Sequence, residues 1–530
     1  MTDRTGTRRG FLRRLGAAAG ASAVYDAMRT LGHAAESDFT RVPPLAKPDG
    51  RTSVAVLGAG LAGLVASYEL SRAGYDVTVL EYQARIGGRN ITLRGGDRLV
   101  EMGSPAQDVH FAPGNYFNPG PWRIPYHHAG LLHYCATLGV ALEPFVETNY
   151  NSLLHSAAHF GGRPQRYRDV AVDYAGYTAE LLTKAINTQA LETGLSRDER
   201  RDVLQALRLT GALDPSGQYH ASDAMALTRG YAKEPGAGEN GAPVPSRPLP
   251  RGELMASGLW QAIAFHQTYE MQTTMFQPAG GMDMISRAFI PHVGHLVRLK
   301  SQVAAIRQDE HGVSVDYTRL EDGTRATLHA DFCICALPLP ILDQLSCQVS
   351  SELKAAIGGI AYHSSVKIGL EFRRRFWEQD DAIYGGISFT DQTISQISYP
   401  SHGYLSRGPG VLLGGYMFGE SAMYLAGMTP AERIALARKE GAAIHPQYDK
   451  EFSNGVSIAW SRVPWTLGCC SNWSDQARQT HYRNLVRMDR RVVLAGEHAS
   501  YVGCWQEGAV LSALNAVTQV NARAHGGQHA

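Results

Sequence analysis

Short apolar runs separated by glycine define the first folding unit of the chain. Residues 53–57 (Ser-Val-Ala-Val-Leu) predict a buried strand, and residues 64–73 predict a helix that Gly74 ends. Residues 76–80 (Asp-Val-Thr-Val-Leu) predict a second strand. The order of strand, helix and strand predicts a βαβ unit near the N-terminus.

The middle of the chain begins with a helical pattern. Residues 169–265 are largely helical, and Ser196 with Glu199 forms a capping box that begins a helix through Leu209. The stretch 232–252 is rich in proline and glycine, which predicts a long surface loop without regular elements. Disorder is the default expectation for this loop; a lid or an assembly contact is also open.

A β-type pattern follows from residue 358 to residue 464. Apolar runs at 365–371, 386–390 and 411–418 predict strands of a second sheet. One helix is expected from Pro430, because proline is favoured at the first helical position after a capping threonine. The pattern therefore predicts an α/β protein with two sheets and a helical insertion between them.

Length and charge exclude several classes of protein. A chain of 530 residues is too long for one ordinary core, so two or three domains are expected, possibly interleaved. The 50 Lys and Arg nearly balance 49 Asp and Glu, which argues against nucleic-acid binding and against an acidic disordered chain.

Glycine is in excess: 56 of the 530 residues are glycine, whereas its usual share is about 7%. Glycines are needed where backbone approaches a ligand closely.

The first 35 residues resemble an export signal. Arg8 and Arg9 precede Phe11 and Leu12, and the soft stretch 15–24 is short and made mostly of alanine and glycine. This order is similar to a twin-arginine signal, which predicts a periplasmic or secreted protein. The stretch is too short for a stable membrane anchor. The alternative is a basic amphipathic N-terminus that lies on the body of the protein.

The seven cysteines follow no disulfide or zinc pattern. Cys333 and Cys335 alternate within the apolar run 332–337, which places both on one buried strand face. We therefore expect no obligatory disulfide and no metal site.

A glycine-rich turn between the first predicted strand and helix carries a ligand-binding signature. The segment 58–63 reads Gly-Ala-Gly-Leu-Ala-Gly, and a carboxylate, Glu81, ends the second strand. Glycines permit the tight turn and the close approach of backbone N–H groups to a pyrophosphate at the helix N-terminus, and the carboxylate accepts ribose hydroxyls. The predicted dinucleotide-binding residues are Gly58, Ala59, Gly60, Gly63 and Glu81.

Two further segments resemble the flavin amine oxidase superfamily. Residues 85–89 read Arg-Ile-Gly-Gly-Arg, and residues 491–498 form a predicted strand that ends in Gly-Glu before an apolar helix at about 509–522. The resemblance implies that FAD is the cofactor and that the fold is a Rossmann-type FAD-binding domain, built from separated stretches, with a mixed-sheet substrate domain and a helical insertion. The additional cofactor residues that it implies are Gly87, Gly88, Arg89, Gly103, Val303, Glu497 and Trp505.

The same resemblance sets the expected boundaries. They are 1–35 for the signal-like segment, 52–110, 285–355 and 485–525 for the FAD-binding domain, 111–165 and 358–484 for the substrate domain, and 166–275 for the helical domain.

Within this superfamily the chain resembles the L-amino-acid oxidases. Residues 121–125 (Pro-Trp-Arg-Ile-Pro) are similar to an element whose arginine, here Arg123, binds the substrate carboxylate. The spacing from Glu101 is longer than usual, so residues 104–119 are expected to loop out. The other implied site residues are Tyr416 as a second carboxylate donor, Trp505 as an aromatic wall, Cys504 through its carbonyl, and Lys367 beside a water at the flavin.

Each of these residues also has an alternative interpretation. Arg123 could lie on the surface, and the two aromatic residues could belong to the core. Lys367 interrupts an apolar strand, where a buried lysine is unfavourable without a role, or it could face solvent from an edge strand.

The implied activity is oxidative deamination of L-amino acids. The products would be a 2-oxo acid, ammonium and, with O2 as acceptor, hydrogen peroxide; a homodimer is usual among such enzymes. The alternatives are an amino-acid 2-monooxygenase, an amine oxidase for substrates without a carboxylate, and a flavin-binding protein without catalysis. The preferred side chain of the substrate is not specified by the sequence.

Overall fold

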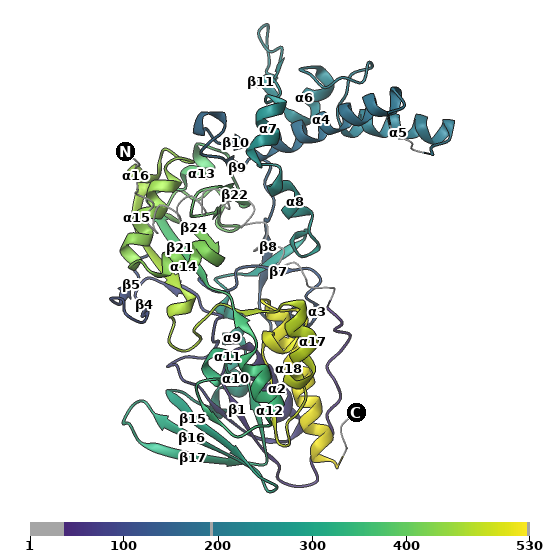
Figure 1. Cartoon of the computed structure of the whole chain (residues 1–530). Helices are drawn as coiled ribbons and strands as arrows, with labels where there is room; N and C mark the ends of the chain where they lie inside the picture. The colour runs from purple at the N-terminus through teal and green to yellow at the C-terminus, as the bar shows by residue number, and fades with distance from the viewer. Residues whose placement is uncertain (1–36, 191–193, 527–530) are drawn as a thin grey trace, which may run out of the picture.

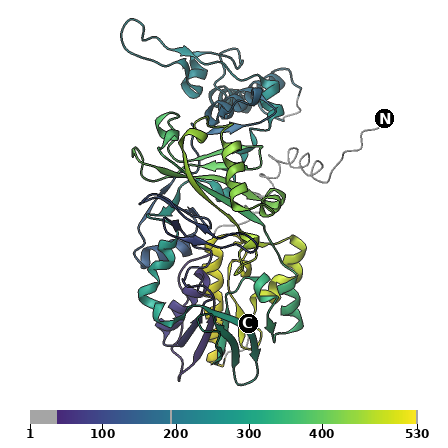
Figure 2. The same ribbon diagram turned by 90° about the vertical axis from the view of Figure 1, so that its left-hand side faces the viewer.

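The computed structural model describes residues 37–190 and 194–526, so the predicted export signal lies outside the described residues. Three parts follow one another along the long axis of the molecule (Figure 1). A parallel sheet with its helices lies at one end, a larger mixed sheet lies in the middle, and a helical arm projects at the other end. The same order is visible after a quarter turn (Figure 2).

A five-stranded parallel sheet forms the first part, and its strands come from three separated stretches of sequence. The predicted strands β1 (Ser53–Leu57) and β2 (Asp76–Leu80) are confirmed and lie side by side in parallel. The order across the sheet is β14 (Val297–Arg298), β2, β1, β18 (Phe332–Cys335) and β27 (Val492–Leu494).

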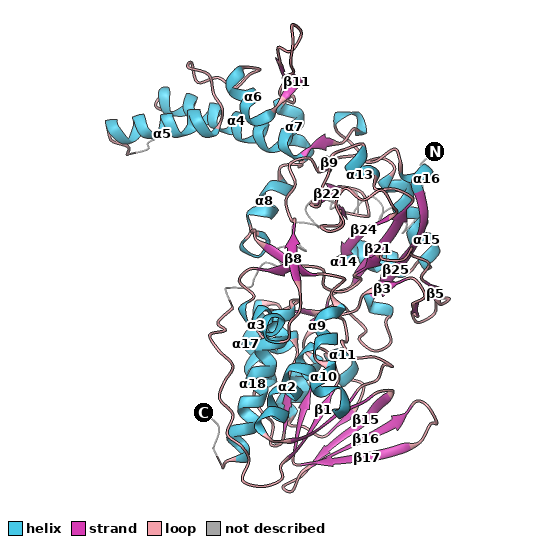
Figure 3. Cartoon of the chain, turned by 180° about the vertical axis from the view of Figure 1, so that it is seen from behind, coloured by secondary structure: helices cyan, strands magenta, loops and turns pink. Residues whose placement is uncertain are grey.

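Helices cover both faces of this sheet, which explains its continuous apolar runs. Val54 and Val56 pack in the core of helices α2 (Leu61–Ala73) and α18 (Gln506–Ala524). Leu57, on the other face, packs with α12 (Ser351–Gly358) and α17 (Asp475–Val486). Figure 3 shows β15 (Ser301–Gln308), β16 (Val313–Arg319) and β17 (Arg325–Ala330) on the flank, where they pair antiparallel. The short strand β19 (Ser346–Cys347) completes this flank sheet and pairs parallel with β15.

The second sheet is mixed. Its order is β10 (Gln165–Arg166), β9 (Leu153–His155), β22 (Ile387–Thr390), β23 (Gln396–Ser398), β24 (Gly410–Phe418), β21 (Ser365–Phe372) and β25 (Phe452–Ala459). The pair β9 and β22 is parallel, and the other pairs are antiparallel. Strand β21 lies between β24 and β25, so Lys367 is not on an edge strand. The predicted helix at Pro430 is α15 (Pro430–Gly441).

A short three-stranded sheet connects the two larger ones. It consists of β7 (Ile124–Pro125), β13 (Met275–Pro278) and β8 (Leu142–Phe145), and β13 pairs antiparallel with both neighbours.

The helical arm contains α4 (Tyr167–Asn187), α5 (Arg197–Thr210) and α6 (Asp223–Arg229). The capping box of Ser196 and Glu199 is confirmed.

The expectation of a stretch without regular elements at 232–252 is wrong. Strands β11 (Tyr231–Lys233) and β12 (Val244–Pro245) pair there, and α7 (Arg251–Ser257) begins within it. Glycines supply the turn between the two strands, where Gly236 donates to the Gly241 carbonyl.

Two smaller expectations also need correction. Helix α2 begins at Leu61 rather than residue 64, because residues 61–63 at the end of the glycine-rich segment already form its first turn. Residues 104–119 are not an unpaired loop: β5 (Gln107–Asp108) pairs with β4 (Arg98–Leu99), and β6 (Tyr116–Phe117) pairs with β3 (Leu93–Arg94). In the described part of the chain, no helix has the length and apolar character of a membrane span.

A fully buried ion pair joins the chain just before this insertion to the second sheet and its helix α15. Arg433 on α15 donates from both terminal nitrogens to the Glu101 carboxylate at 2.8 Å, and neither side chain is exposed. The Ala459 N–H donates to the same carboxylate. A buried charge without its partner is strongly unfavourable, so the pair fixes this part of the chain against the sheet.

We expect Arg433→Met to lower the free energy of unfolding by about 3–5 kcal/mol, because it leaves Glu101 buried and unpaired. Chemical denaturation followed by circular dichroism measures this loss. Arg51→Met is the control, since Arg51 forms an exposed pair with Asp76 and such pairs contribute about 0–1 kcal/mol. A loss no larger than that of the control would contradict the assignment.

Candidate active site

A deep cavity lies where the parallel sheet meets the mixed sheet. It encloses about 1450 Å³ of empty space, open solvent at its mouth included. Most of the predicted site residues line it, although they come from stretches far apart in the sequence. They are Gly58, Gly60, Glu81, Gly87, Gly88, Arg89, Arg123, Lys367, Tyr416, Glu497, Cys504 and Trp505.

Two glycine segments form one side of the cavity. Gly60 and Gly87 pair as a parallel bridge, and the Gly87 N–H donates to the Ala59 carbonyl at 2.8 Å. Gly87 has a φ of 104°, a conformation that other residues rarely adopt. Gly63 lies behind the turn, where a Cβ atom would stand 1.9 Å from the Gly58 carbonyl oxygen. A Cβ atom at Gly88 would stand 3.1 Å from Gly60 Cα, so a side chain there would push the two glycine segments apart.

The N-terminus of α2 opens at this glycine turn. No side chain caps it, and its first turn has no acidic residue, so its partial positive charge is not neutralised locally. Glu81 lies beside it, buried, and its carboxylate accepts from the N–H groups of Ala59 and Gln83 at 2.7 and 2.8 Å. Burial raises the pKa of Glu81, and the two backbone donors act in the opposite direction. This pairing of a helix N-terminus with a carboxylate suits a dinucleotide.

Arg89 and Glu497 meet at the base of the cavity. Arg89 Nη1 lies 3.1 Å from a Glu497 oxygen and also donates to the Cys469 carbonyl. Although burial disfavours the ionised form, the Arg89 guanidinium lowers the pKa of the Glu497 carboxyl. The Glu497 carboxylate further accepts from Ser471 and from the Cys504 N–H. Burial lowers the pKa of the adjacent His498 to about 4, which fits a neutral structural histidine.

Buried polar atoms without hydrogen-bond partners indicate a ligand in the half of the cavity that contains the glycine turn, which we call the cofactor half. Both side-chain atoms of the Asn90 amide are buried without a hydrogen-bond partner in the described structure, and so is Gln506 Oε1. Both residues line the cavity. Buried polar groups are normally paired, so these atoms fit a bound group with donors and acceptors of its own. The glycine turn, the helix N-terminus and the orphaned amides therefore fit FAD.

The other half of the cavity is aromatic and holds the predicted lysine. Lys367 is 3% exposed, and its Nζ donates to the Gly120 carbonyl. Nζ lies 4.1 Å from the ring centre of Trp122 and 4.4 Å from that of Tyr416. Burial lowers the pKa of Lys367 well below its usual value and raises that of Tyr416. Burial thus shifts the titration of both side chains in the direction of their neutral forms.

Arg123 is buried and lines the cavity, so the surface alternative is excluded. Its Nη1 donates to both oxygens of the Glu147 carboxylate at 2.9 Å, and its Nη2 contacts Met271 Sδ at 3.0 Å. Glu147 is fully buried; burial raises its pKa, and the Arg123 guanidinium opposes this. The guanidinium is thus held firmly, with one terminal nitrogen on a weak acceptor.

A disulfide in the cavity wall corrects the cysteine expectation. Cys470 and Cys504 are bonded, with their Cα atoms 5.0 Å apart, and both line the cavity. They are separated by 34 residues without any pattern, so only the fold brings them together. Cys333 and Cys335 are buried on β18, as predicted, and are free thiols.

Four predicted cofactor residues are absent from the cavity lining that the structure describes. Ala59 and Gly63 lie within the glycine turn, next to residues that do line the cavity. Gly103 lies in a turn beside Arg462, and Val303 lies on β15 of the flank sheet, where it packs in the core. Gly120, which follows the paired insertion at 104–119, lines the cavity, whereas Gly103, which precedes it, does not. The sequence contained one signal for Gly120 as a site residue, because it stands immediately before the arginine element at 121–125.

Other site residues left no signal in the sequence. Glu147 and Met271, which hold Arg123, come from separate segments, and Trp460 and Trp465 add to the aromatic wall. None of these four residues belongs to a local sequence motif, so only the three-dimensional structure shows that they contact the site.

The chain is similar to a known protein family and to several known proteins. The profile described as flavin containing amine oxidoreductase matches residues 61–521. An L-amino-acid oxidase of Siganus canaliculatus is 29% identical over 478 residues, which cover 88% of this chain and 85% of that protein. A flavin-dependent L-tryptophan oxidase of Lentzea aerocolonigenes is 28% identical over 500 residues, covering 89% and 98%. A putative L-amino-acid oxidase of Bacillus subtilis is 26% identical, covering 88% and 94%.

Solved structures show the same fold. A cyclohexylamine oxidase from Brevibacterium oxydans superposes with a TM-score of 0.60 at 17% identity, covering 89% of this chain and 99% of that one. A putrescine oxidase variant reaches a TM-score of 0.59 at 16% identity, covering 89% and 99%.

Gly63→Ala tests the glycine turn. The added methyl group would collide with the Gly58 carbonyl, so we expect the purified protein to lose most of its bound FAD and its yellow colour. The ratio of flavin absorbance to protein absorbance measures this loss. Gly408→Ala, where a Cβ atom meets nothing within 4 Å, should keep the wild-type ratio. Equal flavin content in both variants would refute the role of the turn.

Proposed function

The chain belongs to the family of flavin-containing amine oxidoreductases, with FAD as its cofactor, and from this premise we propose that it oxidatively deaminates L-α-amino acids. The observation that carries the proposal is the placement of Arg123, Tyr416 and Lys367 in one cavity with the glycine turn. The names of the relatives, an L-amino-acid oxidase and an L-tryptophan oxidase, support the same substrate class.

The cofactor half of the cavity would hold FAD along the parallel sheet. The FAD-binding domain would then consist of the three stretches that supply the sheet, with the mixed sheet as the substrate domain and the arm as the helical domain. The pyrophosphate would lie on the N-terminus of α2, with Glu81 on the ribose. The residues assigned to FAD are Gly58, Ala59, Gly60, Gly63, Glu81, Gly87, Gly88, Arg89, Glu497 and Trp505.

Arg123 would anchor the substrate carboxylate. Its Nη2 now contacts the thioether of Met271, and a carboxylate is a much stronger acceptor for that donor. Glu147 fixes the guanidinium through Nη1, so little side-chain entropy is lost on binding. Tyr416 has a neutral phenol that can donate a second hydrogen bond to the same carboxylate.

The rest of the cavity would orient the amine and exclude water. Trp505 forms one wall, and the Cys504 carbonyl is the proposed acceptor for the substrate amine. Trp122 packs edge to face on Tyr416 with ring centres 5.0 Å apart, which holds the phenol in place. Such positioning contributes a large part of catalysis when the reacting atoms are held in contact.

On the opposite side of the cavity, Lys367 would bind a water molecule and accept a proton. Gly120 accepts one of its hydrogen bonds, and the remaining valences of Nζ can hold a water. Burial shifts the pKa of Lys367 downward, and in its neutral form Nζ would carry a lone pair that can accept a proton from the substrate ammonium group. Bound FAD supplies hydride acceptance and the transfer of electrons to O2, with hydrogen peroxide as the reduced product. The imino acid released from the site hydrolyses to a 2-oxo acid and ammonium.

Export through the twin-arginine signal and assembly as a homodimer complete the proposal. The signal lies at residues 1–35, outside the described part of the chain.

A peroxidase-coupled assay across the twenty L-amino acids and their D forms tests the activity. We expect hydrogen peroxide, ammonium and a 2-oxo acid in equal amounts from L forms only. Cyclohexylamine and putrescine, which lack a carboxylate, should be turned over at least about 100-fold less efficiently, because they cannot use the Arg123 anchor. Comparable rates with these amines would contradict the proposal, and release of carbon dioxide with an amide would indicate a monooxygenase.

The Arg123 anchor is tested with a double substitution. Arg123→Met alone would leave Glu147 buried and unpaired, which destabilises the fold. Arg123→Met with Glu147→Met removes both charges, and we expect kcat/KM for L-amino acids to fall by about 100-fold, or ~3 kcal/mol. Arg94→Met, which breaks a pair with Asp283 away from the cavity lining, is the control. An unchanged kcat/KM in the double variant would refute the anchor.

A further inference from the structure

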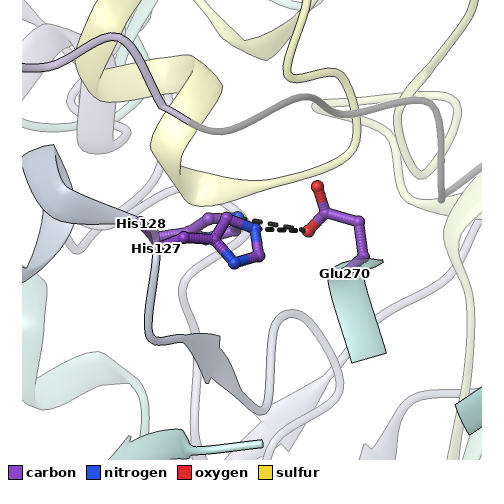
Figure 4. Close-up of side chains that lie close together, drawn as sticks. All are labelled: His127, His128 and Glu270. Carbon is purple, nitrogen blue, oxygen red and sulfur yellow. Dashed lines mark hydrogen bonds and ion pairs between the residues drawn. The ribbon is translucent and has the colours of Figure 1, made fainter. Parts of the chain in front are cut away.

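Two histidines and a glutamate converge beside the proposed active site. His127 and His128 follow β7, and Glu270 lies on the short 3-10 helix η2 (Tyr269–Met271). Figure 4 shows both imidazole rings facing the Glu270 carboxylate. The Nε2 atoms of His127 and His128 lie 3.2 and 3.4 Å from the same oxygen, Glu270 Oε2. Among the described residues, this is the group of His, Cys, Asp and Glu whose ligand atoms converge within 4.8 Å.

The cluster is sealed from solvent but incompletely paired. The residues are 8%, 1% and 0% exposed for His127, His128 and Glu270. His128 Nε2, His127 Nδ1 and Glu270 Oε1 are buried without a hydrogen-bond partner in the described structure. Buried polar atoms are rarely left unpaired, because the loss of water is then uncompensated. One of these atoms, His128 Nε2, is among the converging atoms, and Glu270 Oε1 is the second oxygen of the carboxylate on which they converge.

The spacing of the donor atoms fits a metal centre. Zinc binds imidazole nitrogen at about 2.0–2.1 Å and carboxylate oxygen at about 2.0–2.2 Å, in tetrahedral geometry. Those bond lengths place neighbouring ligand atoms about 3.3–3.5 Å apart. The two distances from Glu270 Oε2 have nearly this length.

The donor set selects the class of metal. Two imidazoles and one carboxylate suit divalent transition metals, whereas Mg²⁺ and Ca²⁺ prefer oxygen ligands alone. Three protein ligands leave at least one position for water. The exposed ring of Tyr126 stacks edge to face on His127, so only one layer of side chains separates the cluster from solvent.

The cluster connects two segments that form the substrate half of the cavity. The histidines lie just after the Arg123 element, and the residue after Glu270 is Met271, whose sulfur contacts Arg123 Nη2. The His128 ring also lies 5.0 Å from that of Trp505. A bond through a metal ion between these two segments would hold Met271 against Arg123 and would fix the His128 ring that packs against Trp505.

We propose that His127, His128 and Glu270 bind one divalent transition-metal ion, with Zn²⁺ as the preferred ion, which ties the β7–α3 connection to η2. Helix α3 (Ala129–Thr137) begins directly after His128. The centre has a structural role at the wall of the cavity. It stands on the buried cluster alone, so it does not depend on which substrate the cavity oxidises.

Metal content of the FAD-loaded full chain tests the proposal. The protein is treated with a chelator, reloaded with Zn²⁺ alone, desalted and analysed by inductively coupled plasma mass spectrometry. We expect one Zn²⁺ per chain and a rise in Tm of several degrees on reloading, since a ligand that binds only the folded state stabilises it. Glu270→Gln and His127→Asn should lower the Zn²⁺ affinity at least about 100-fold and abolish the rise in Tm.

Controls separate the centre from surface binding and from misfolding. His311→Ala removes a histidine whose side chain is 86% exposed, and this variant should keep both the Zn²⁺ and the Tm shift. Flavin absorbance and circular dichroism identify the folded variants, and the conservative His127→Asn provides a second variant if Glu270→Gln does not fold. A wild-type protein that takes up no Zn²⁺ would overturn the proposal. Stoichiometric Zn²⁺ in the folded Glu270→Gln and His127→Asn variants would overturn it equally.

Discussion

The buried carboxylate of Glu497 connects the chain segments that form the cavity. It pairs with Arg89 from the N-terminal stretch and accepts from the backbone and side chain of Ser471 and from the Cys504 N–H. A buried charge is tolerated only with such a set of partners, because the loss of hydration must be offset. The base of the cavity, the strand β27 and the wall at Cys504 and Trp505 therefore depend on one another. Neither large sheet could form this cavity alone.

Local patterns predicted much of the fold and of the cofactor half of the site. Residues 53–57 and 76–80 are strands with the predicted bounds, because their apolar runs are buried on both faces. The capping residues at Ser196 and Thr429 begin helices where expected. The glycine turn lines the cavity for the same reason: its information lies within a few consecutive residues.

The features that the sequence missed depend on contacts between distant segments. Glu147 is buried only because Arg123 meets it, and the disulfide of Cys470 and Cys504 joins two loops. Gly103 lies outside the cavity lining, on the near side of a paired insertion whose position a fixed spacing between motifs does not predict. The stretch 232–252 formed a strand pair because its glycines gather in one turn rather than along its whole length. Such outcomes follow from tertiary packing and not from local propensity.

Under the proposed export route, the disulfide in the cavity wall sets an order for the maturation of this protein. Cytosolic thiols are kept reduced, so Cys470 and Cys504 would remain separate thiols while the chain folds and acquires its cofactor there. The bond would form only on arrival in an oxidising compartment, where it joins the loop before Trp505 to the loop that follows Cys469. Cofactor loading would then precede covalent closure, and the mature, oxidised molecule would retain a ligand that entered while this wall was still free to move.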